Sequence, residues 1–64
     1  MTPVPAAINP HWVIRYPGAE PMNFGTDGRR ARDVFEAARD RAKPNGGSGE
    51  LWVGATLVDR FDVP

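Results

Sequence analysis

The 64-residue chain contains no cysteine and only one histidine, His11. Without cysteine it can form neither a disulfide nor a thiolate zinc site, the usual cross-links of very small domains. A Ser/His/Asp arrangement would need Ser48, the only serine, which lies in a glycine-rich stretch unsuited to holding a nucleophile. No acidic cluster has the spacing of a calcium-binding loop. We therefore expect a protein that is not an enzyme and that uses no metal or cofactor.

The sequence also lacks net charge and long hydrophobic runs. Eight Lys and Arg residues balance eight Asp and Glu residues, which argues against general binding to nucleic acid or to an anionic membrane. No apolar run approaches the roughly 20 residues of a membrane-spanning helix. The first residues have neither the basic nor the apolar region of a signal peptide. We therefore expect a cytoplasmic protein with no membrane partner, and consider a nucleic acid partner a minor alternative.

Residues 1–10 (MTPVPAAINP) contain three prolines and no periodic pattern, which predicts an extended N-terminal arm before a single domain over 11–64. Residues 11–17 alternate, with Trp12, Ile14 and Tyr16 on one face, as in a strand. Pro17-Gly18 fits a type II turn, and a short second strand is expected at residues 22–24. Pro21 at its start favours an edge position.

Residues 27–43 carry the clearest pattern, an apolar stripe at helical spacing. We expect Thr26 or Asp27 to cap the helix, and Pro44 followed by Asn45-Gly46-Gly47 to end it. A flexible Gly/Ser connector is expected next. The stripe consists of Ala31, Val34, Phe35, Ala38 and Ala42.

Residues 50–63 form two apolar segments around Gly54-Ala55, which fits a type II′ hairpin turn. A regular hairpin would pair Leu51 with Val58. The expected faces are then Trp52, Leu57 and Phe61 on one side, and Leu51, Val53, Val58 and Arg60 on the other. Both faces would be largely apolar, which is more surface than one helix can cover. The predicted fold class is α+β, a small β-β-α-β-β domain with an antiparallel sheet and one helix packed on one face.

Four segments carry a resemblance: 11–18 (HWVIRYPG), 24–27 (FGTD), 50–52 (ELW) and 57–61 (LVDRF). Together they resemble short uncharacterised proteins of actinobacteria and their phages, over about 50 of the 64 residues. The Gly54-Ala55 turn departs from the Asp-Gly usual there. Seven of the eight cations are arginine, a bias typical of GC-rich genomes. The resemblance implies a fold and a phage origin, and no activity.

Five residues are candidates for partner binding. Trp12 and Trp52 supply the largest apolar side chains, and tryptophan is a common interface anchor. Arg29, Arg30 and Arg32 cluster at the start of the helix, where cations oppose the helix dipole. They could contact an acidic partner or nucleic acid phosphate, or pair with Glu20, Asp33 or Glu36.

The apolar surplus favours a small non-enzymatic protein-binding module, such as a phage or mobile-element protein that engages a host or defence protein. One alternative is a self-assembling structural protein, with a homodimer formed through a sheet face or an edge strand. A second alternative is a nucleic-acid-binding regulator that uses Arg29, Arg30 and Arg32.

Overall fold

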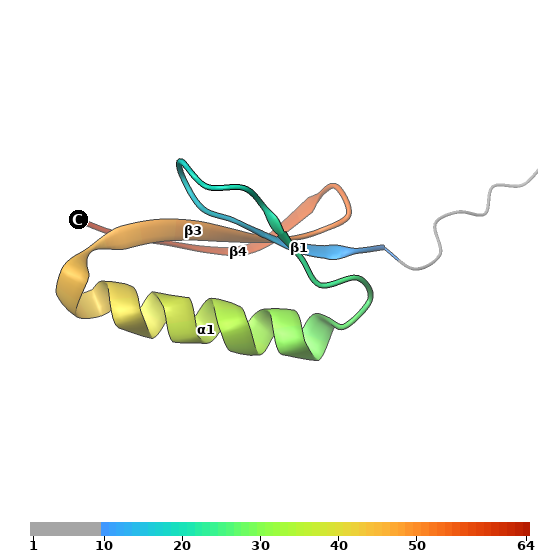
Figure 1. Cartoon of the computed structure of the whole chain (residues 1–64), viewed down its shortest axis with the longest axis horizontal. Coiled ribbons are helices and arrows are strands. Elements are labelled where there is room, and N and C mark those ends of the chain that lie inside the picture. The colour runs from blue at the N-terminus through green and yellow to red at the C-terminus, as the bar shows by residue number, and fades with distance from the viewer. Residues whose placement is uncertain (1–9) are drawn as a thin grey trace, which may run out of the picture.

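The computed structural model describes residues 10–64 as a four-stranded antiparallel sheet with one helix on one face (Figure 1). The predicted N-terminal arm lies, except for Pro10, outside the described residues. The elements are β1 (Trp12–Arg15), β2 (Met22–Asn23), α1 (Gly28–Asn45), β3 (Gly47–Val53) and β4 (Thr56–Val63). The strand order is β2-β1-β3-β4. This confirms the predicted α+β fold class and element order.

The β1–β2 hairpin forms as the sequence predicts. The Ala19 N–H donates to the Tyr16 carbonyl at 3.2 Å, and Gly18 has φ 75°, the conformation that a type II turn requires. Ile14 pairs with Met22, and β2 is an edge strand of the sheet. The proline at position 21 is thus tolerated because the outer side of β2 has no ladder to complete.

Helix α1 begins where the capping pattern predicts and continues through Pro44. The Asp27 carboxylate accepts a hydrogen bond from the Arg30 N–H at 3.0 Å, which satisfies one free donor of the first turn. At the other end Pro44 does not stop the helix, because it lies inside the last turn. The expected stop at Gly46 is confirmed, since Gly46 has φ 82° and donates its N–H to the Ala42 carbonyl.

Replacing Asp27 with alanine tests this cap. The change leaves the Arg30 N–H without its acceptor, and we expect it to lower the free energy of unfolding by about 1 kcal/mol. Urea denaturation followed by circular dichroism measures the loss. Asp27→Asn, which keeps an acceptor oxygen, serves as the control and should stay within about 0.5 kcal/mol of the natural protein.

The glycine-rich segment after the helix is not a flexible connector, and that expectation is corrected. Gly47, Ser48 and Gly49 form the first part of β3 and pair with Val63, Asp62 and Phe61 of β4. Gly49 is buried, and a Cβ there would lie 2.9 Å from the Phe61 ring and 3.0 Å from the Tyr16 ring. Glycine at this position therefore provides room for two aromatic rings rather than flexibility.

The second hairpin has the predicted turn but not the predicted register beyond it. Gly54, the first central residue of the turn, has φ 60°. Ala55, the second, has no positive φ, like every non-glycine residue of the described chain. This combination is that of a type II′ turn. Val53 pairs with Thr56 and Trp52 with Leu57, but Leu51 pairs with Asp59 and not with Val58. Val58 is the extra residue of a β-bulge, which reverses the alternation of everything after it.

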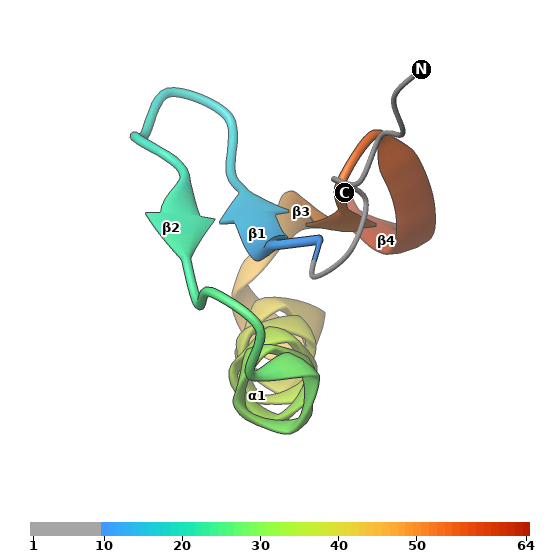
Figure 2. The same cartoon turned by 90° about the vertical axis from the view of Figure 1, so that its right-hand side faces the viewer.

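The bulge corrects the expected faces. Phe61 lies on the helix side of the sheet with Leu51 and Val53, whereas Trp52, Leu57 and Arg60 lie on the other side. Figure 2 shows the two layers end-on, with α1 beneath β1 and β3. The buried apolar side chains thus gather in one core between the layers. Its buried members are Ile14, Ala31, Phe35, Ala42, Leu51 and Phe61.

Candidate protein-binding surface

The sheet face opposite α1 is not covered by any element within residues 10–64, and we call it the open face. The strand register assigns its residues, because side chains that are paired across antiparallel strands point to the same side. Figure 1 shows that the β1–β2 loop and the β3–β4 turn both rise on this side. The open face comprises Val13, Arg15, Asn23, Ser48, Glu50, Trp52, Leu57, Arg60 and Asp62.

Trp52 is the largest side chain of the open face and lies at its centre. It is flanked by Val13 on β1 and by Leu57 on β4. Leu57 is 40% exposed and Trp52 is half-buried. These three residues form an apolar row across the side of the sheet that α1 does not cover.

The indole of Trp52 is held in a fixed orientation by two charged neighbours. Its Nε1–H donates to Glu50 Oε1 at 2.9 Å, and the guanidinium carbon of Arg15 lies 5.6 Å from the ring centroid. A cation–π contact at an exposed site is worth about 0.5–1 kcal/mol. Because the ring is already ordered, a partner that packs on it would lose little side-chain entropy.

A row of alternating charge borders the apolar row. Arg15 lies opposite Glu50 in the strand register, and Glu50 lies opposite Arg60, so an acidic residue stands between two basic ones. Beside it the surface is hollowed by about 320 Å³, between this row and the Tyr16-Pro17 corner. An apolar centre with a charged rim is the general anatomy of a protein–protein interface.

The two tryptophans do not lie on one surface. Trp12 is on the helix side of the sheet, partly buried against the core. A Cβ built on Gly28, the first residue of α1, would lie only 2.5 Å from its indole. Trp12 therefore joins the start of the helix to the sheet, and of the two it is Trp52 that is presented on the uncovered face.

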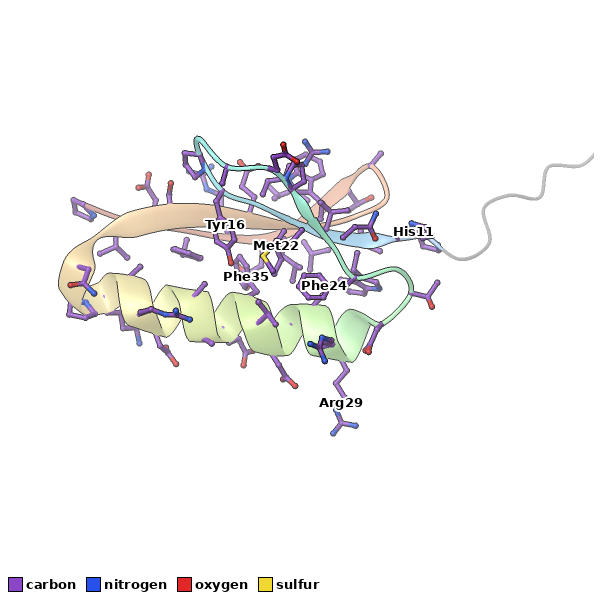
Figure 3. All side chains as sticks on the ribbon, viewed as in Figure 1. His11, Tyr16, Met22, Phe24, Arg29 and Phe35 are labelled. Atoms are coloured by element: carbon purple, nitrogen blue, oxygen red, sulfur yellow. The ribbon has the colours of Figure 1, made fainter. Side chains whose placement is uncertain are left out.

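The arginine cluster stands apart from the open face. Arg29, Arg30 and Arg32 are all exposed on α1, and Figure 3 shows Arg29 pointing away from the sheet. The alternative in which they pair with Glu20, Asp33 or Glu36 is not realised. Within residues 10–64 the one ion pair is Lys43–Asp40, at 3.6 Å. The structure thus gives two separate candidate surfaces and not one combined site.

The helix side carries a shallow groove near the end of α1. Tyr16 and Met22 form one wall and Arg41 and Asn45 the other, and Figure 3 shows Tyr16 and Met22 between the layers. Burial raises the pKa of the Tyr16 hydroxyl, while the nearby Arg41 acts in the opposite direction. The phenol is therefore neutral at physiological pH and is not poised as a base.

The described chain holds no cluster of side chains around its histidine or of metal-ligating type. His11 is exposed just before β1, and Figure 3 shows it at the N-terminal end of that strand. No group of three or more His, Asp or Glu side chains within residues 10–64 is arranged to hold a metal ion. The helix of this region is not apolar enough to cross a bilayer.

Sequence reasoning found Trp52 but not its surroundings. It placed Phe61 on the same face as Trp52, and Arg60 on the opposite face. The signal for the true arrangement is the Glu50-x-Trp52 spacing, because residues two apart in a strand share a face. The position of Arg60 depends on the bulge. Comparison with protein-family models, curated proteins and solved structures finds no match to this chain, so no related sequence indicates the bulge.

Proposed function

We propose that the protein is a small non-enzymatic protein-binding module that docks a partner protein on its open face. The observation that carries the proposal is the position of Trp52, fixed by Glu50 and Arg15 on the sheet face that α1 leaves uncovered. Aromatic anchors at the centre of an interface commonly supply most of its binding energy. The phage origin that the resemblance implies, and a host or defence protein as the partner, belong to this proposal as its biological setting.

The chemistry of the open face describes the partner surface. Its centre is apolar, so the partner offers an apolar patch or pocket that receives the indole and Leu57. Its rim carries Arg15, Glu50 and Arg60 in alternating charge, so the partner offers a carboxylate near each guanidinium. This mixed rim favours a protein over nucleic acid, whose uniform negative charge would be repelled by Glu50.

The proposal predicts that Trp52→Ala weakens partner binding and leaves the domain folded. Affinity capture from lysate of the source cell, followed by mass spectrometry, identifies the protein bound by the natural chain. Calorimetry with that purified protein then measures the loss, expected to be at least about tenfold in Kd. Leu57→Ala should also weaken binding, by a smaller factor.

Met22→Ala is the matched control. Met22 is 42% exposed, against 40% for Leu57, but it lies on the helix side. Removing a similar apolar area from the opposite side should leave partner affinity unchanged. A partner that binds Trp52→Ala as tightly as the natural chain would refute the proposal, as would equal losses for Met22→Ala and Leu57→Ala.

A further inference from the structure

The outer edge of β4 is the longest unpaired strand edge in the described chain. β4 spans eight residues at one end of the sheet, whereas β2, at the other end, spans two. A long edge presents free N–H and C=O groups that can bond to another strand. We propose that this edge pairs with the same edge of a second copy, antiparallel, with Arg60 opposite Asp62 of the other copy.

The hydrogen bonds of β1 show which way the backbone groups of the sheet point. The Trp12 N–H donates to Gly25 O, and the Trp12 carbonyl accepts from the Phe24 N–H, both at 2.8 Å. Trp12 thus directs both groups away from β3. Because direction alternates along a strand, Arg15 directs its groups toward β3, where it faces Glu50.

The same alternation continues into β4. Glu50 directs its backbone groups toward β1, so the residue opposite it on β4, Arg60, directs its own outward. Asp62, two residues on, does the same. The Asp59 carboxylate accepts a hydrogen bond from the Arg60 N–H at 2.8 Å, as expected for a donor that has no acceptor in β3.

Several registers of the two β4 strands would let the outward backbone groups of Arg60 and Asp62 form hydrogen bonds between the copies, and side-chain charge favours one of them. A two-fold axis at Arg60 would place two guanidinium groups face to face, and one at Asp62 would place two carboxylates face to face. An axis at Phe61 places Arg60 opposite Asp62 twice. Opposite charges across a strand pair are favourable and like charges are unfavourable. This register also forms about four backbone hydrogen bonds between the copies.

The register fixes the form of the dimer. Because paired residues share a face, both helices lie on one side of the joined sheet and both Trp52 side chains on the other. The interface uses the same surface from each copy, so assembly stops at two. The remaining edge, β2, is short and follows Pro21. The dimer would present two open faces, and its existence does not depend on the proposed function.

Sedimentation velocity on the whole chain between about 10 µM and about 1 mM tests the proposal, a range suited to a small interface. We expect a concentration-dependent dimer. Asp62→Arg, which places arginine opposite Arg60 of the other copy, should weaken it by about tenfold or more. The double exchange Arg60→Asp with Asp62→Arg restores opposite charges and should recover the dimer.

Three further variants make the result decisive. Glu36→Arg, a charge reversal on the exposed surface of α1, should leave the dimer unchanged. Asp59→Ala removes the competing acceptor of the Arg60 N–H and should tighten it. If circular dichroism shows that the double exchange unfolds, Asp62→Pro decides, because it deletes an outward N–H without removing a bond to β3 and should abolish the dimer.

A natural chain that stays monomeric at about 1 mM, a concentration at which a dimer with a Kd of about 1 mM or below is detected, overturns the proposal. So does a dimer whose affinity is the same in Asp62→Arg and in the natural chain. Partner binding is measured separately through Trp52, so the failure of either proposal leaves the other standing.

Discussion

Phe35→Ala is expected to leave the protein largely unfolded at 25 °C. Phe35 is fully buried, and its ring lies 5.3 Å from that of Phe61 at an interplanar angle of 57°. Truncating a buried phenylalanine costs about 3–5 kcal/mol. At about 0.05–0.15 kcal/mol per residue, a domain of this size has a total stability of similar magnitude. Thermal and urea denaturation followed by circular dichroism measure the loss.

Phe35→Leu is the control for this prediction. Leucine keeps most of the buried volume, so we expect a loss below about 1.5 kcal/mol and a cooperative transition. If Phe35→Ala melts within a few degrees of the natural protein, the core described between α1 and the sheet is not the main source of stability. That outcome would also contradict the packing of Phe35 against Phe61.

Gly28→Ala is expected to destabilise the protein, although helix propensity predicts the opposite. Gly28 is the first residue of α1 and has no positive φ. Alanine there would ordinarily raise the free energy of unfolding by about 0.5–1 kcal/mol. Its new Cβ, however, would lie within 2.5–2.7 Å of three Trp12 ring atoms. Overpacking of this kind costs about 1–3 kcal/mol, so the net change should be a loss.

A double-mutant cycle separates the two effects. In a Trp12→Val background the clash is absent, and Gly28→Ala should become neutral or stabilising. The coupling energy from urea denaturation of the four proteins should therefore be at least about 1 kcal/mol. Equal effects of Gly28→Ala in both backgrounds would show that the contact between Trp12 and the start of α1 does not constrain the fold.

The extent to which the fold can be predicted follows from how local each signal is. The cap at Asp27, the turn at Gly18 and the apolar stripe that contains Phe35 depend on neighbours in the sequence. They could therefore be predicted. The inclusion of Pro44 in the helix is harder to predict. A proline in the last turn removes one backbone hydrogen bond, and the bond from Gly46 to Ala42 that offsets this loss is seen only in the structure.

The errors in the candidate site have non-local causes. Gly49 is indistinguishable in sequence from a linker glycine, and its role depends on Phe61 of β4 and on Tyr16, the residue after β1. The bulge at Val58 has no sequence signature of the usual kind, since no glycine or proline marks it. Trp52 could be selected by size alone, but its isolation from Phe61 required the register.

Val58 shows that the spacing of a strand can matter more than the side chains within it. Leu57 and Phe61 are four positions apart, a separation that puts two residues on the same side of a regular strand. Here one contributes to the open face and the other to the core. Regular pairing without the bulge, with Val58 opposite Leu51, would turn Phe61 to solvent and Arg60 toward the core. A chain that lacks Val58 would therefore keep Phe61 in the core by regular pairing, whereas insertion of one further residue between Leu57 and Phe61 would require a second irregularity to keep it there.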